Sequence, residues 1–262
     1  MSRPEFIAPP EIYYNQEESH KYTNNTRVQQ IQAEMTLRAL ELLNLPSSQY
    51  VLDIGCGSCL SGQVLTEEGH QWVGMDISAA MLGNALDLDV EGDLFLADMG
   101  AGVPFRPGSF DAAISISAIQ WLCNADSAEA NPKKRLKQFF ETLYASLKRG
   151  GKAVCQFYPV GQDQIDLILH SAKVAGFGGG MVIDRPESKR HKKYYLVLTA
   201  GIDGDLNLAN VEIENNVSKR KKRKGDESKR DFIKRKKDTM RKRGKDVASD
   251  SKFTGRRRKP KF

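Results

Sequence analysis

The chain has 262 residues and a formal net charge of +7, which is enough for one well-buried α/β domain with an appended segment. No stretch approaches the roughly 20 apolar residues of a membrane-spanning helix, and the proline-rich residues 1–14 lack the apolar core of a signal peptide. We therefore expect an intracellular protein. Four cysteines, at positions 56, 59, 123 and 155, are too few for a disulfide framework and are expected to be free thiols.

Charge is divided unevenly along the chain. Residues 218–262 contain 22 Lys and Arg against 6 acidic residues (+16), so residues 1–217 contain 18 against 27 (−9). The basic part has too few apolar residues to offset its chain entropy, and we expect it to be unfolded when alone. Although a solvated charge run is the usual interpretation, its attachment to an acidic body favours a polyanionic substrate, bound in a salt-dependent way. The run at 219–224 (KRKKRK) also fits nuclear import.

Apolar spacing predicts strands that alternate with helices. This order indicates an α/β fold with a doubly wound, mainly parallel, Rossmann-like sheet, whose ligands bind at the carboxyl ends of the strands. The predicted elements are, in chain order, helix 26–45, strand 50–54, helix 60–68, strand 71–75, helix 78–86, strands 94–97 and 112–117, helix 133–147, strand 153–157, helix 162–175 and strand 194–199.

The first strand runs into a glycine turn at residues 51–62 (VLDIGCGSCLSG). Gly55 and Gly57 allow a tight backbone and close approach of a ligand. A nicotinamide dinucleotide site would want a third glycine where Leu60 stands, and Asp53 before the turn would repel a pyrophosphate. The turn therefore suits a ligand without phosphates, such as S-adenosylmethionine, whose methionine end is zwitterionic and whose sulfonium is cationic.

Two more acids end the next two strands. Asp76 follows Gly57 by 19 residues, and its two oxygens match the two hydroxyls of a ribose. Asp98 could accept the adenine amine, with the Met99 backbone beside it. Taken alone, Asp76 could be a helix N-cap, but three acids at three successive strand ends favour a cofactor site. The cofactor-binding candidates are Asp53, Gly55, Cys56, Gly57, Asp76, Ile77, Asp98, Met99 and Ser115.

The fourth strand leads into residues 115–124 (SISAIQWLCN). They lack the Asn or Asp followed by two prolines that usually serves methylation of exocyclic amines, and no catalytic base is evident. A ring nitrogen with a free lone pair, such as guanine N7, needs no deprotonation, and alignment can supply most of the rate. Trp121 could stack on a base and Asn124 could read its edge, although Trp121 fits a core or lid residue equally well. No catalytic residue is assigned.

Cys56 and Cys59 form a C-x-x-C pair that invites a redox or zinc interpretation. A structural zinc needs four ligands, whereas Cys123 and Cys155 lie singly on other elements. We favour small residues packed in the glycine turn, and we expect no metal.

Several segments together resemble the eukaryotic small-subunit (18S) rRNA guanine-N7 methyltransferase family, which acts in ribosome biogenesis. The narrowest signatures are the runs at 120–124 and 251–255. One departure is Cys59, where the family usually has glycine, which puts the cofactor affinity in question. The matching segments are 3–6 (RPEF), 9–14 (PPEIYY), 21–27 (KYTNNTR), 38–43 (RALELL), 97–100 (ADMG), 104–111 (PFRPGSFD), 115–126, 193–196 (KYYL) and 250–260 (DSKFTGRRRKP).

This resemblance implies a class I S-adenosylmethionine-dependent enzyme that methylates guanine N7 in 18S rRNA and takes part in pre-rRNA processing and 40S biogenesis. It implies that Gly55, Gly57, Asp76, Asp98 and Met99 hold the cofactor and that Tyr14 and Arg27 help to cover it. It also implies residence in the nucleus and nucleolus, with the cytoplasm left open. The expected organisation is an N-terminal helical extension (1–48), a methyltransferase domain (49–201), an acidic linker (202–217) and a basic disordered tail (218–262).

The resemblance further implies a partner, a small zinc-ribbon activator protein that several methyltransferases share. In the usual strand order, residues 94–97 (LFLA) form an edge strand. An apolar edge is an aggregation hazard unless another chain pairs with it. We therefore predict a heterodimer through this edge.

Two other functions stay open at this stage. A small-molecule methyltransferase of the same fold would not need the basic tail. A non-catalytic assembly factor that binds rRNA would not need the cofactor site, and catalytic and assembly roles could coexist in one chain.

Overall fold

The computed structural model describes residues 3–125, 131–188, 191–201, 212–214, 233–234, 237–238, 241 and 247–251. The chain divides into two units, residues 1–215 and 216–262. In the second unit the backbone of residues 233–234, 237–238 and 241 is helical, and Asp250 accepts ion pairs from Lys237 and Arg241, each at 3.2 Å. The expected disorder of residues 218–262 and most of the expected linker otherwise fall outside the described residues.

The first unit is an eight-stranded sheet in the order β3-β2-β1-β4-β5-β7-β6-β8. The pairs from β3 through β5 are parallel, whereas β7 is antiparallel to both of its neighbours. The prediction of a mainly parallel sheet is therefore confirmed. The strands are β1 Tyr50–Ile54, β2 Gln71–Asp76, β3 Asp93–Leu96, β4 Phe110–Ile116, β5 Leu147–Phe157, β6 Phe177–Asp184, β7 Lys193–Ala200 and β8 Glu212–Glu214.

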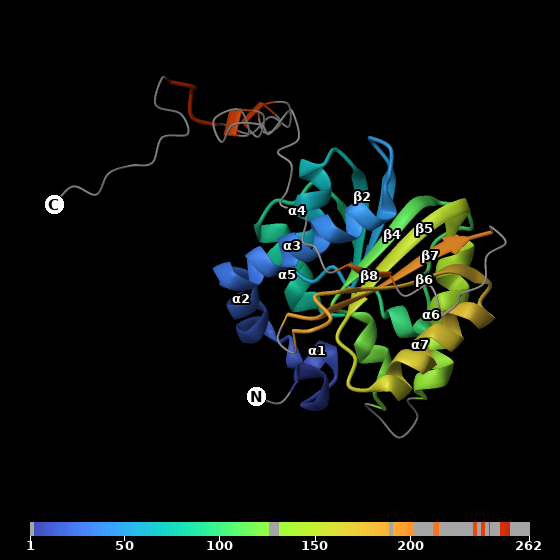
Figure 1. Cartoon of the computed structure of the whole chain (residues 1–262). Helices are drawn as coiled ribbons and strands as arrows, with labels where there is room; N and C mark the ends of the chain where they lie inside the picture. The colour runs from blue at the N-terminus through green and yellow to red at the C-terminus, as the bar shows by residue number, and fades with distance from the viewer. Residues whose placement is uncertain are drawn as a thin grey trace. The chain divides into compact units, whose positions relative to one another are not determined.

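Helices cover both faces of this sheet (Figure 1). Helices α3, α4 and α5 lie on one face, and helices α6 and α7 lie on the other. None of the described helices is both long and apolar enough to cross a membrane. The helices are α1 Pro10–Tyr13, α2 Gln16–Asn24, α3 Thr26–Leu43, α4 Leu60–Glu67, α5 Ala79–Asp87, α6 Pro132–Ser146 and α7 Gln162–Val174, with 3-10 turns η1 Pro4–Phe6, η2 Met99–Ala101 and η3 Ile119–Cys123.

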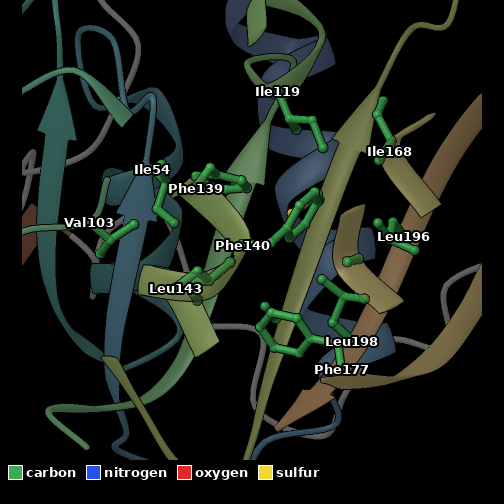
Figure 2. Close-up of a cluster of buried hydrophobic side chains, with 14 of the residues drawn as sticks. Ile54, Val103, Ile119, Phe139, Phe140, Leu143, Ile168, Phe177, Leu196 and Leu198 are labelled. Atoms are coloured by element: carbon green, nitrogen blue, oxygen red, sulfur yellow. The ribbon is translucent and has the colours of Figure 1, made fainter. Parts of the chain in front are cut away.

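The core consists of two layers, one on each face of the sheet. Successive side chains of β1 belong to different layers, because the side chains of a strand point alternately to its two faces. Leu52 and Ile54 pack toward α6 and α7, whereas Val51 packs toward α3 and α4. Figure 2 shows the first layer, where Phe139 and Phe140 of α6 are fully buried against the sheet. The sheet is thus held rigidly from both sides, which fixes the positions of its strand ends.

The structure has elements that local spacing did not predict. The strand β6 has the sequence FGGGMVID, whose glycines weaken a strand pattern. Gly179 takes a φ of +129°, and a Cβ there would lie 2.1 Å from the carbonyl oxygen of Val197, so this strand is built on close backbone approach to β7. The strand β8 lies within the segment expected to be linker.

The contact of α4 with β2 gives a testable prediction. A Cβ on Gly62 would lie 2.3 Å from the Trp72 indole, so Gly62→Ala should lower the free energy of unfolding by about 1–3 kcal/mol through overpacking. Gly83 of α5 has nothing within 4 Å of such a Cβ, and Gly83→Ala should instead stabilise by up to about 1 kcal/mol through helix propensity. Urea denaturation of both variants checks this. Equal effects would contradict the packing argument.

Candidate active site

A cavity of about 800 Å³, which includes space open to solvent, lies at the carboxyl ends of β1 to β4. This is the edge at which doubly wound sheets bind ligands, and the size is in the ordinary range for a ligand pocket. Its floor consists of residues that end or follow the four strands: Gly55, Cys56, Gly57, Met75, Asp76, Ile77, Ala97, Asp98, Met99, Ile116, Ser117 and Ala118. Its remaining walls come from Pro10, Tyr14, Tyr22, Gln32, Leu60, Ser61, Met81, Trp121 and Arg135.

The glycine turn after β1 is shaped by close packing on one side and left open on the other. Gly55 has a φ of +69°, and a Cβ there would lie 2.3 Å from the Ala118 Cβ. Gly57, with a φ of +54°, faces the cavity, and a Cβ on it would meet nothing closer than the Met81 sulfur at 3.8 Å. Position 55 therefore needs glycine for packing, whereas glycine at 57 keeps space for a ligand against bare backbone.

Asp76 ties this turn to the end of β2. Its Oδ2 accepts the Gly57 N–H and its Oδ1 accepts the Ser78 N–H, both at 2.8 Å. Burial raises the pKa of Asp76, while these backbone donors oppose the rise. The N-cap of α5 is Ser78, whose Oγ accepts the Met81 N–H, so the N-cap alternative for Asp76 is wrong. Each carboxylate oxygen keeps a lone pair that could accept from a ligand.

Asp98 stands at the end of β3 beside a cation. Its Oδ1 accepts the Gly100 N–H at 2.7 Å and lies 3.2 Å from Nη2 of Arg135 on α6. Asp76 and Asp98 thus line one cavity from neighbouring strand ends, as their spacing in the sequence predicts.

Known proteins resemble this chain over its full length. It is 60% identical over 275 residues to the 18S rRNA (guanine(1575)-N(7))-methyltransferase of Saccharomyces cerevisiae, with 100% of both chains covered. It is 50% identical over 275 residues to the 18S rRNA (guanine-N(7))-methyltransferase of Mus musculus, covering 99% of this chain and 98% of the mouse protein. The chain belongs to the 18S rRNA (guanine-N7)-methyltransferase family.

Two family models agree with this membership. One described as "Methyltransferase domain" matches residues 52–155, and one described as "Methyltransferase involved in Williams-Beuren syndrome" matches residues 198–260. As a member of this family the protein is an S-adenosylmethionine-dependent methyltransferase.

Solved structures show the same fold at low sequence identity. The phosphoethanolamine N-methyltransferase 2 of Haemonchus contortus, in complex with S-adenosyl-L-methionine, superposes with a TM-score of 0.55 at 17% identity, covering 77% of this chain and 61% of that chain. A TehB-like methyltransferase from Corynebacterium glutamicum gives a TM-score of 0.54 at 18% identity over 71% of this chain and 99% of that chain. The predicted Rossmann-like methyltransferase fold is thereby confirmed.

Several residues expected at the site of this methyltransferase lie outside the cavity. Arg27 is exposed in the first turn of α3, where its backbone N–H donates to the capping Asn25 side chain. Ser115 is fully buried within β4 and does not line the cavity. Asn124 donates its Nδ2 to the Glu5 carbonyl oxygen at 2.8 Å, which anchors the N-terminal turn η1. Arg27, expected to cover the cofactor, and Asn124, expected to read the edge of a base, therefore do not line the cavity in this structure.

Asp53 also lies one layer behind the cavity. Its Oδ2 accepts a hydrogen bond of 2.5 Å from the Oγ of Ser61, which does line the cavity. Asp53 is 1% exposed, and burial raises its pKa to about 7, with the Ser61 bond opposing and the nearby Asp76 adding to the rise. This carboxyl can therefore act on a ligand through Ser61.

The N-terminal residues form a cover that local spacing did not reveal. The Ser78 hydroxyl donates to the Tyr14 carbonyl oxygen at 2.8 Å, and the Tyr14 ring lies 5.8 Å from that of Tyr22 and 5.9 Å from that of Trp121. Burial raises the pKa of both tyrosines. Trp121 is 6% exposed and lines the cavity as one wall of this aromatic cluster.

Ser117, directly after β4, is another cavity residue, and the sequence analysis did not single it out. Its φ of +59° is uncommon for a residue with a Cβ. Its hydroxyl donates to Oε1 of the buried Gln156 at 2.7 Å, and its N–H donates to the Gln156 carbonyl oxygen at 2.9 Å. Backbone held in a sparsely populated conformation often occurs at functional sites.

The cysteine pair belongs to the packing of the turn. Cys56 and Cys59 are buried free thiols, and burial is one reason that the pKa of Cys56 is raised, after its contact with Cys59. Cys59 has a φ of +62°, a conformation that glycine adopts without strain. The described residues contain no group of three or more His, Cys, Asp or Glu side chains placed to hold a metal ion.

Proposed function

We propose that this methyltransferase transfers a methyl group from S-adenosylmethionine to N7 of a guanine in small-subunit (18S) rRNA. The observation that supports it most is the shared cavity of Gly57, Asp76 and Asp98 in a chain 60% identical to a yeast 18S rRNA (guanine(1575)-N(7))-methyltransferase. Since Gly57 has no side chain, the cofactor can lie directly against the backbone of the protein at this position. The cofactor supplies an electrophilic methyl group on a sulfonium.

The chain's own residues would bind and orient the two reactants. Asp76 would accept from the ribose hydroxyls, and Asp98 would accept from the adenine amine, with Met99 and Ile77 beside them. The glycine turn would hold the methionine end of the cofactor. Ser61 would relay the charge of Asp53 toward the cationic end.

The wall near β4 suits a nucleophile that needs no deprotonation. The described residues on it are Ser117, Ala118, Ile116 and Trp121, none of which is a general base. Guanine N7 carries a free lone pair, so alignment within the aromatic walls of Tyr14 and Trp121 is the main task of the protein here. The basic residues 218–262 (+16) would bind the RNA backbone, and affinity for RNA should fall steeply with salt.

The decisive experiment maps N7-methylguanine in 18S rRNA from cells that lack the chain and carry either wild type, Asp76→Lys or the exposed-acid control Asp163→Lys. Wild type and the control should restore one methylated guanine, and Asp76→Lys should not. Methylation unchanged at every site in cells without the chain would overturn the substrate. Restoration of 40S subunits by Asp76→Lys would indicate that an assembly role can act without catalysis.

The proposed location is the nucleus and nucleolus, where pre-rRNA is processed.

We also propose that a small zinc-ribbon activator protein pairs with the edge strand β3. This strand ends the sheet order of the described strands, and Phe95 and Leu96 on it are 44% and 63% exposed. Leu86, near the end of α5, is also an exposed apolar residue, with an exposed fraction of 69%. An unpaired apolar edge favours addition of a strand from another chain.

Substitution on this edge tests the partner. Leu96→Asp should abolish co-elution with the co-expressed activator in size-exclusion chromatography, because a charge would be buried in the interface. Val174→Asp, at an apolar residue of α7 that is 58% exposed, should leave co-elution intact. A wild-type chain that is monomeric and fully active on its own at submicromolar concentration would contradict the heterodimer.

A further inference from the structure

We propose that Arg135 is a positioning residue that fixes the Asp98 carboxylate and thereby sets the preference of the cofactor site for adenine over hypoxanthine. This inference rests on the proposed role of Asp98 as acceptor of the adenine amine. It adds a residue from α6, a helix that no sequence motif connects with the cofactor.

The geometry of the pair is specific. Nη2 of Arg135 lies 3.2 Å from Oδ1 and 3.5 Å from Oδ2 of Asp98, and all three of Asp98, Met99 and Arg135 line the cavity. The guanidinium packs closely against Gly100, where a Cβ would be 2.3 Å from its Nε. The Arg135 side chain is 18% exposed, so the contact is shielded more than a surface ion pair.

The donors are distributed unequally between the two carboxylate oxygens. Oδ1 accepts both the Gly100 N–H at 2.7 Å and the shorter contact from Arg135, whereas Oδ2 has the 3.5 Å contact. Oδ2 therefore keeps the greater capacity to accept a further hydrogen bond. Two donors on Oδ1 stop the carboxylate from rotating, so that Oδ2 stays directed to one place.

Helix α6 holds the loop after β3 at a second point, which provides a matched control. Thr142, about two turns beyond Arg135, accepts the Val103 N–H with its Oγ1 at 2.8 Å. Both contacts order the same loop, but the Thr142 contact does not reach Asp98. A role limited to loop order would therefore be shared by both residues, whereas a role in base preference belongs to Arg135 alone.

Hypoxanthine differs from adenine in carrying a carbonyl oxygen where adenine has the amine. A fixed carboxylate oxygen accepts from the amine and opposes the carbonyl, since neither oxygen can donate. Once Arg135 is lost, the carboxylate can rotate away from the carbonyl, and the penalty against hypoxanthine should shrink.

The test compares binding of S-adenosylhomocysteine and S-inosylhomocysteine to the full chain by calorimetry. Wild type should prefer the adenosyl ligand by about tenfold to hundredfold, the range of one hydrogen bond to a charged group. Arg135→Gln should reduce this preference by about tenfold, and Thr142→Val should keep the wild-type ratio. Arg135→Lys should give an intermediate ratio, because an ammonium keeps the charge but lacks the planar fork.

The ratio of the two affinities separates a role in positioning Asp98 from a role in the stability of the fold. If Arg135→Gln lowered both affinities equally and kept the wild-type ratio, or if Thr142→Val lowered the ratio as much, the role of Arg135 would be overturned. Should Arg135→Gln fail to fold, Arg135→Lys decides by the same ratio. Wild type that binds neither ligand would overturn the proposed cofactor site itself, whereas wild-type binding with an unchanged ratio in both Arg135 variants overturns this inference alone.

Discussion

Replacing Asp76 with alanine is expected to lower the affinity for S-adenosylmethionine by about a hundredfold or more. The carboxylate is predicted to accept from the ribose, and it also accepts the Gly57 N–H at 2.8 Å, so one substitution removes a ligand contact and loosens the turn on which the ligand lies. Hydrogen bonds to a charged group contribute about 1.5–3 kcal/mol each, and 1.4 kcal/mol is one decade of affinity. Titration calorimetry measures the loss.

Two further variants make this result interpretable. Asp76→Asn keeps one acceptor oxygen and the shape of the side chain, so its affinity should lie between those of wild type and Asp76→Ala. Asp163→Ala removes an exposed acid from α7 and should bind like wild type. If Asp76→Ala stayed folded and bound within about threefold of wild type, the central role of Asp76 would be wrong.

The strand ends could be predicted from the sequence because their signals are local. An apolar run followed by glycine or an acid marks where a buried strand leaves the sheet, and parallel strands bring such ends to one edge. Gly57, Asp76 and Asp98 accordingly line one cavity. The six helices and strands predicted between residues 50 and 117 also lie within a few residues of their observed bounds.

The residues that complete the site could not be predicted in this way, because their contacts join distant parts of the chain. Tyr14 reaches the cavity through a carbonyl bond to Ser78, 64 positions away, and the polar sequence around it has no periodicity that marks a buried face. Arg135 and Asp98 are 37 positions apart, and either residue alone resembles an ordinary surface charge. Local spacing also cannot show which way a side chain turns, so Asp53 was a cofactor-binding candidate although its side chain points to Ser61.

The buried Asp53 gives the second large prediction, which concerns pH. Its ordinary pKa is near 3.8, and burial raises it to about 7 in the folded protein. Between these two pH values, the Asp53 carboxyl is therefore protonated in the folded state and ionised in the unfolded chain. The stabilising contribution of the neutral carboxyl is complete below about pH 4 and disappears as the pH rises through 7. With about 1.4 kcal/mol for each pKa unit, the loss is about 4 kcal/mol by pH 8.

Asp53→Asn should remove this dependence, because the amide cannot ionise. The free energy of unfolding from urea melts between pH 4 and pH 8 should fall less steeply in the variant than in wild type. Ser61→Ala should extend the fall in stability to higher pH than in wild type, since the Ser61 hydroxyl favours the ionised form. Identical slopes in wild type and Asp53→Asn would contradict the raised pKa.

The same titration should couple to the cofactor. A cationic sulfonium next to Ser61 favours the ionised form of Asp53, so binding near pH 6.5 should release a fraction of a proton, which calorimetry detects as a heat that varies with the ionisation enthalpy of the buffer. The uncharged thioether of S-adenosylhomocysteine should release less, and Asp53→Asn should abolish the difference between the two ligands. The buried Asp53 carboxyl thus lowers the stability of the fold at neutral pH, but it attracts the charged S-adenosylmethionine more than the neutral S-adenosylhomocysteine. This difference favours release of the product after each transfer.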